Sequence, residues 1–88
     1  MSIFVFPSKL RIRTKADVQS FLTECSGETY WTDGEMDYHF DNGKIGVRPQ
    51  SERGNVFAPY VILTPEEAAK VVWRTRKDIN GVLYSRSH

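Results

Sequence analysis

Two dipeptides, Asp33-Gly34 and Asn42-Gly43, constrain the fold of this chain more than any other feature. An Asp-Gly or Asn-Gly pair flanked by alternating residues is the strongest short-range signal for a two-residue β-hairpin turn. Two such turns so close together predict a three-strand antiparallel meander, which we place between about residues 28 and 48.

Counting outward from the two turns predicts how these strands pair. Side chains alternate between the two faces of a strand, so one face of the meander should be apolar and buried. Its expected cross-strand pairs are Trp31 with Met36, Tyr38 with Val47, and Phe40 with Ile45. The opposite, polar face should pair Asp37 with Arg48, Asp41 with Lys44, and Glu28 with His39.

A helix is predicted on each side of the meander. The first begins at Thr14, with Asp17 completing a box-like start, and ends at Ser26-Gly27. Its apolar positions are Val18, Phe21, Leu22 and Cys25. The second begins at "TPEE", where Thr64 caps, Pro65 takes the first helical position and Glu67 completes a capping box. It should bury Ala68, Val71, Val72, Thr75 and Ile79 and end near Asn80-Gly81.

The remaining strand candidates lie at residues 3–6, "IFVF", and 56–64, "VFAPYVILT", where Pro59 suggests a sheet edge or a bulge. The expected order is β-α-β-β-β-β-α. We therefore predict a fold of the α+β class, in which an antiparallel sheet, the meander plus flanking strands, has two helices packed on one face. The length of 88 residues fits a single domain over residues 1–88.

Composition limits the partners. Twelve Lys and Arg against eleven Asp and Glu give a net charge of +1, so no strong overall field draws the chain to nucleic acid or a membrane. Cys25 is the single cysteine and cannot form an internal disulfide, which favours a reducing compartment. No apolar run reaches the length of a membrane span. We expect a cytoplasmic protein with no membrane association.

Charge is nevertheless unevenly distributed along the chain. Residues 24–41 contain six of the eleven acidic residues and no Lys or Arg. An acidic sheet face with exposed aromatic residues suits a partner protein that has a basic surface, and it can stand in for nucleic acid phosphates. The expected partner-binding residues are Glu28, Tyr30, Glu35, Asp37, His39, Asp41 and Trp73.

Two other interpretations of this face stay open. Glu28, Asp37 and His39 could hold a metal ion, or His39 could act as a general base. An open sheet face offers no concave wall, however, and no Ser or Cys is placed to act as a nucleophile. We therefore expect no enzyme, no metal and no cofactor. The face could also be only the solvated side of the sheet.

A basic surface offers an alternative function in weak nucleic acid binding. Basic residues alternate in "KLRIR" and recur at helical spacing in the last helix, where Trp73 lies off the apolar stripe. Trp73 could stack on a base, anchor an interface or be covered, with Lys77 against its indole. The residues of this alternative are Lys9, Arg11, Arg13, Lys70, Arg74 and Lys77.

Two resemblances follow from these patterns. The order helix, three-strand meander, helix over residues 14–80 resembles the double-stranded RNA-binding domain. That family holds phosphates with lysines at the start of its last helix, where this chain has Glu66 and Glu67, so the resemblance implies a topology and not that activity. In its small size and acidic hairpin "ETYWTDGEMDYHFD", the chain is similar to single-domain inhibitors of phages and mobile elements, including anti-CRISPR proteins. That similarity implies an inhibitor that blocks a nucleic-acid-binding partner.

Overall fold

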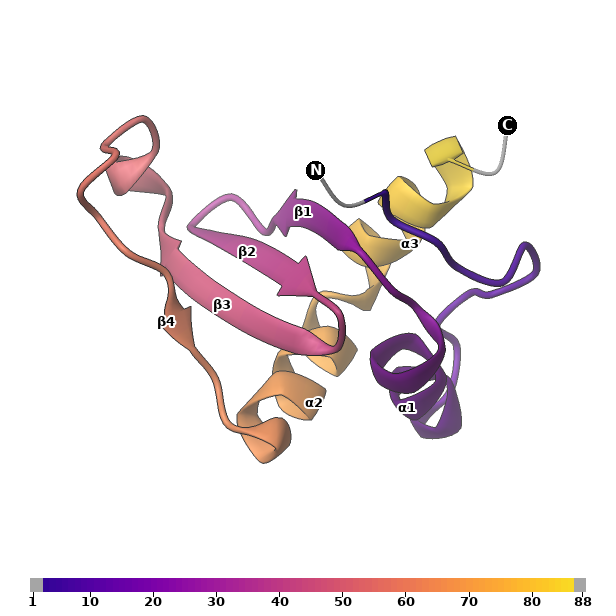
Figure 1. Cartoon of the computed structure of the whole chain (residues 1–88). Helices are drawn as coiled ribbons and strands as arrows, with labels where there is room; N and C mark the ends of the chain where they lie inside the picture. The colour runs from indigo at the N-terminus through magenta and orange to yellow at the C-terminus, as the bar shows by residue number, and fades with distance from the viewer. Residues whose placement is uncertain (1–2, 87–88) are drawn as a thin grey trace.

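The computed structural model describes residues 3–86, and they form an α+β fold with a four-strand antiparallel sheet and three helices (Figure 1). The strands lie side by side in the order β1-β2-β3-β4. Along the chain the elements are α1 (Lys15–Glu24), β1 (Glu28–Thr32), β2 (Met36–Asp41), β3 (Lys44–Pro49), a 3-10 turn (Gln50–Glu52), β4 (Val61–Ile62), α2 (Pro65–Arg74) and α3 (Arg76–Arg86).

The turn between β2 and β3 forms at Asn42-Gly43 as predicted. Both residues have positive φ, 48° and 91°, which is the requirement of a type I′ turn. The pairing of β2 with β3 is the predicted one, with Tyr38 opposite Val47 and Phe40 opposite Ile45.

The pairing predicted around the first turn is wrong by two residues. Trp31 lies opposite Tyr38 and not Met36, and His39 lies opposite Tyr30 and not Glu28. The cause is the Asp33 side chain, whose Oδ1 accepts hydrogen bonds from the backbone N–H groups of Glu35 and Met36. Gly34, with φ 94°, therefore becomes the first central residue of the turn. A shift of two keeps every side chain on its face but changes its neighbours.

The segment ahead of α1 does not join the sheet, so the predicted strand at residues 3–6 is wrong. Over residues 3–14, its only β-pairing is one bridge between Val5 and Ser26. Leu10 and Ile12 are buried, although they lie in irregular chain. The amide of Asn80 holds this segment, since it accepts from the Ile12 N–H at 2.8 Å and donates to the Ile12 carbonyl at 3.0 Å.

The predicted last helix is two helices. Both helix starts have the predicted capping boxes, at Thr14 and at Thr64. The helix α2 ends at Arg74, and Thr75 is its C-cap. The Thr75 hydroxyl donates to the Val71 carbonyl and accepts from the indole N–H of Trp31 at 3.0 Å. The end predicted at Asn80-Gly81 is wrong because α3 continues past it and buries Leu83, one turn beyond Ile79.

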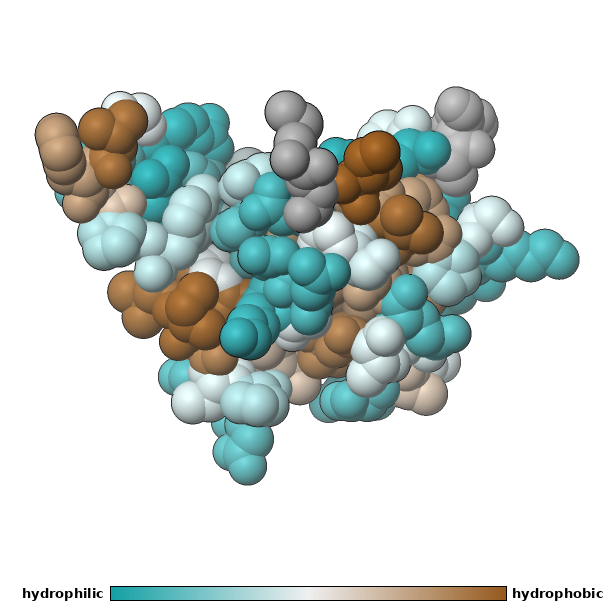
Figure 2. Space-filling view, viewed as in Figure 1, coloured by the Kyte–Doolittle hydropathy of each residue, from teal (hydrophilic) through white to brown (hydrophobic). Residues whose placement is uncertain are grey.

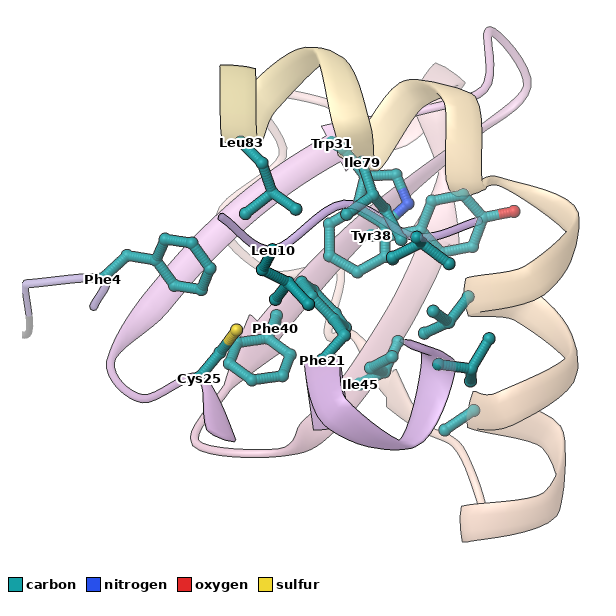
Figure 3. Close-up of a cluster of buried hydrophobic side chains, with 14 residues drawn as sticks. Phe4, Leu10, Phe21, Cys25, Trp31, Tyr38, Phe40, Ile45, Ile79 and Leu83 are labelled. Carbon is teal, nitrogen blue, oxygen red and sulfur yellow. The ribbon is translucent and has the colours of Figure 1, made fainter. Parts of the chain in front are cut away.

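The core lies between one face of the sheet and the helices (Figure 3). Phe21 of α1 is fully buried against Phe40 and edge-on to Trp31, with ring centroids 4.9 and 5.9 Å away. The helices add Val18, Ala68, Val72, Ile79 and Leu83 to the core. The other sheet face carries the predicted polar residues, and we call it the outer face.

Candidate functional site

The middle of the outer face is a row of rings that crosses three strands. The Tyr30 ring stacks on the His39 imidazole at 4.6 Å, with an interplanar angle of 10°. The Tyr60 ring lies 5.4 Å beyond His39. Tyr60 comes from the segment between β3 and β4, a long loop that extends beyond the end of β3 and returns to β4 (Figure 1).

Gly46 provides the space that Tyr60 occupies. A Cβ at Gly46 would lie 2.8 Å from the Tyr60 Cβ, which is closer than real contacts allow. A glycine inside a strand often marks such a close approach. This signal in the sequence could have identified Tyr60 as part of the outer face, which the sequence-based expectation missed.

We expect Gly46→Ala to displace Tyr60 and to destabilise the fold by about 1–2 kcal/mol, the usual cost of overpacking. Urea unfolding measures the stability, and NMR contacts between the Tyr60 and His39 rings measure the displacement. Gly81→Ala is the matched control, because nothing lies within 4 Å of its added Cβ and a helical alanine is favoured over glycine. Intact ring contacts in the Gly46→Ala variant would contradict this account.

Asp37 is largely covered, with 7% of its surface exposed. It lies opposite Arg48 as predicted, but its ion pair is with Arg53, at 2.5 and 3.0 Å from its two oxygens. Hydrogen bonds from Arg53 hold the pKa of Asp37 below its ordinary value, although burial opposes them. Asp37 therefore fixes the loop to the sheet, and its carboxylate is already paired.

Arg48 lies opposite Asp37 as predicted, but its guanidinium forms no ion pair with that carboxylate. Its guanidinium lies over the Tyr60 ring, 4.6 Å from the centroid, and donates to the Ala58 carbonyl at 3.2 Å. Its buried Nε has no hydrogen-bond partner among residues 3–86. Next to it is a pocket of about 390 Å³ on the outer face, lined by Tyr30, Trp31, Thr32, Asp37, Tyr38, Arg48, Arg53 and Tyr60.

The shifted register brings two carboxylates together at the other end of the row. Glu28 lies directly opposite Asp41, next to the pair of Tyr30 and His39. Within residues 3–86 their charges are weakly compensated, because Glu28 Oε1 lies 3.5 Å from His39 Nε2 and Asp41 accepts a hydrogen bond from the neighbouring Asn42 amide. Across the described residues, Asp41 forms no ion pair with Lys44, its predicted partner on β3.

The acidic residues of segment 24–41 do not form one surface. Asp33 is not available to a partner, since its Oδ2 accepts from the Tyr38 hydroxyl at 2.7 Å and from Arg74 at 3.0 Å. Burial alone would raise the pKa of Asp33, but hydrogen bonds from Met36, Tyr38, Glu35 and Arg74 hold it well below its ordinary value. Glu35 is exposed, but it lies at the first turn, about 20 Å of strand from Asp41.

Trp73 is not part of the outer face. It is partly buried against the core from α2, and its indole is covered by Arg76 at 4.0 Å and Lys15 at 5.3 Å, not by Lys77. This position agrees with the covered alternative for Trp73. A small pocket of about 260 Å³ between α1 and α2 is lined by Lys15, Val18, Gln19, Ala69, Lys70 and Trp73.

The six basic residues of the nucleic acid alternative lie in the segment ahead of α1 and on α2 and α3. They do not form the predicted arrangement, because that segment is not a strand and the predicted last helix is two helices. Arg74 is bonded to Asp33 and to the Tyr38 hydroxyl, and Arg11 donates to the Leu10 carbonyl and lies over the Tyr84 ring. The other four, Lys9, Arg13, Lys70 and Lys77, are exposed.

Among residues 3–86, no group of three or more His, Cys, Asp or Glu side chains could hold a metal ion. Burial raises the pKa of the Cys25 thiol to about 11, which keeps it protonated at neutral pH.

Within residues 3–86, no helix has the length and apolar character needed to cross a membrane.

Charge divides the chain into two parts of opposite sign. Residues 24–53, which build β1 to β3 and the turn after them, hold seven acids and three bases, whereas the rest of the chain holds four acids and nine bases. Polar residues cover the middle of the sheet, and hydrophobic ones gather at the loop tip and over β4 (Figure 2). The exposed apolar residues of that region are Val56, Phe57, Val61 and Ile62.

No protein-family model, curated protein or solved structure matches this chain, so its functional interpretation rests on its own residues.

Proposed function

We propose that this chain is a non-enzymatic interaction protein that binds a positively charged surface of a partner protein. The contact surface is the part of the outer face formed by Glu28, Tyr30 and Asp41, which we call the acidic edge. The observation that carries this proposal is the pair of opposed carboxylates, Glu28 and Asp41, beside an exposed tyrosine.

The opposed carboxylates have a cost in the isolated chain. Like charges directly across an antiparallel pair are destabilising, by a few tenths of a kcal/mol or more. No Lys or Arg of the described residues forms an ion pair with either of them. A basic side chain from a partner would relieve this repulsion, and the relief would contribute to the free energy of binding.

Tyr30 gives the acidic edge a second means of recognition. It is 56% exposed, and its ring is held rigidly by stacking on His39. A rigid, amphipathic tyrosine is a common anchor at protein interfaces, and its ring face attracts a Lys or Arg side chain. A partner arginine over Tyr30 would have Glu28 and Asp41 within reach.

The partner class follows from the sign of the charge. A surface that presents carboxylates can occupy a site that is built for phosphates, so we propose a nucleic-acid-binding protein as the partner and inhibition as the outcome. This is the mode of action of an anti-CRISPR-like inhibitor from a phage or mobile element. The excess of acids in residues 24–53 favours the approach of such a partner.

The test is affinity capture from host cells with the wild type and the double variant Glu28→Arg/Asp41→Arg. We expect a partner retained by the wild type to be lost by the double variant and to be displaced by duplex or single-stranded nucleic acid. The control is Glu24→Arg/Glu66→Arg, which reverses two exposed acids outside the acidic edge.

Folding can be separated from binding in this experiment. Glu28→Gln/Asp41→Asn removes the repulsion without large change of shape, so its thermal midpoint should be equal to or above that of the wild type. The proposal fails if Glu28→Arg/Asp41→Arg and Glu28→Gln/Asp41→Asn both capture the same proteins as the wild type.

A further inference from the structure

Arg48 is a positive charge on the outer face that forms no ion pair with a carboxylate of the described residues. Its cross-strand neighbour Asp37 uses both oxygens for Arg53. In residues 3–86, no acidic side chain lies within ion-pair distance of the Arg48 guanidinium. Arg48 interacts with the charge of Asp37 but forms no ion pair with it, and a partly buried charge with so little compensation calls for a functional explanation.

The guanidinium is nevertheless held in place. Tyr60 stacks against it, and the Ala58 carbonyl accepts from Nη1. Nε is covered and has no acceptor within the described part of the chain. An arginine fixed in this way loses little freedom when it binds an anion, and with Nε covered and Nη1 bonded, Nη2 is the nitrogen left to meet a carboxylate.

The pocket beside Arg48 has the size and lining of a small binding site. Its volume of about 390 Å³ lies within the range of ligand pockets, and the rings of Tyr30 and Tyr60 are part of its wall. Arg53 and Asp37 also line it, so its three charged groups sum to one positive charge. A single negative charge balances that sum.

The same surroundings disfavour a polyanion. Glu28 and Asp41 lie on the same face beside Tyr30, and they would repel a chain of phosphates. A flat apolar group with one carboxylate meets less repulsion, and the tyrosine rings can pack against its faces.

We propose that this pocket binds one carboxylate through Arg48, attached to a flat or aromatic group that packs against Tyr30 and Tyr60. The carboxylate has two possible sources, a small aromatic acid or the carboxyl terminus of a polypeptide that ends in an aromatic residue. This inference goes beyond the proposed function, since it stands whether or not the acidic edge binds a basic partner.

NMR titration of the full chain tests it, with the Arg48 Nε–H and the Gly46 amide as reporters. The probes are benzoate and N-acetyl-glycyl-phenylalanine, each compared with its neutral amide. We expect both acids to shift the reporters with saturation and the amides to leave them unchanged. Tighter binding of benzoate would identify a small acid as the natural source, and tighter binding of the peptide acid a chain terminus.

Variants show whether Arg48 is responsible. Arg48→Gln should weaken benzoate binding by at least about tenfold. Arg48→Lys should weaken it less, because the positive charge remains although the planar guanidinium group is lost. Lys44→Gln, on the same face, should stay within about twofold. Glu28→Gln/Asp41→Asn should bind benzoate at least as well as the wild type, which separates this site from the acidic edge.

Three results would overturn the proposal: equal shifts with acid and amide, no shift up to ~20 mM benzoate, or full binding by Arg48→Gln. The comparison of acid with amide uses only the wild type. It therefore decides the question even if Arg48→Gln fails to fold.

Discussion

Asp33→Ala should destabilise the fold by about 3 kcal/mol, the usual cost of breaking a partly buried ion pair together with its hydrogen bonds. The Asp33 carboxylate joins three parts of the chain, since it accepts from the first turn, from the Tyr38 hydroxyl and from Arg74 of α2. Removal of the carboxylate leaves the Tyr38 hydroxyl and Arg74 without their acceptor. Urea unfolding at neutral pH measures the loss.

The control for Asp33 is Glu35→Ala, in the same turn, whose exposed side chain should contribute within about 0.5 kcal/mol. Asp33→Asn should lie between the two, because the amide oxygen can still accept from the turn. An Asp33→Ala variant as stable as Glu35→Ala would show that the network contributes nothing.

The pH dependence gives an independent check on Asp33. Its folded pKa is depressed, so its contribution is fully present above the unfolded pKa of about 4 and is lost as pH falls toward the folded value. The stability difference between wild type and Asp33→Asn should therefore be constant from pH 7 to about 5 and shrink below about 4. A difference that grows on acidification would have the wrong sign.

Phe21→Ala should have the largest effect of all, about 4 kcal/mol, because it opens a cavity among three other rings. Small domains have a total stability of about 5–15 kcal/mol, so this variant should be close to unfolding. Urea unfolding and the near-ultraviolet signal of the buried rings measure it. Phe57→Ala is the matched control, since that ring is 89% exposed and should change stability by less than about 0.5 kcal/mol.

Features determined by local geometry could be predicted from the sequence. The turn at Asn42-Gly43 needs two residues with positive φ, and few other pairs provide them. The two capping boxes depend only on residues three apart. The alternation of strand residues gave the correct faces of the meander even where the register was wrong.

Features that depend on distant residues could not be predicted. The first turn forms one residue later than expected because Asp33 bonds within the turn as well as to Tyr38 and Arg74. Thr75 ends α2 where it meets the indole of Trp31, 44 residues away in sequence. The site had the same limit, since no local pattern shows that Arg53 takes the carboxylate opposite Arg48.

The uneven distribution of charge also affects the electrostatic potential around each side of the molecule. At physiological ionic strength the Debye length is about 8 Å, well below the smallest extent of the molecule, 21 Å. A molecule that approaches the acidic edge therefore senses mainly Glu28 and Asp41, and one that approaches the helices senses mainly the bases there. In dilute buffer the screening length grows beyond the thickness of the protein, and the two opposite fields then partly cancel. Association at either side should therefore depend on salt in a way that the net charge of +1 does not indicate.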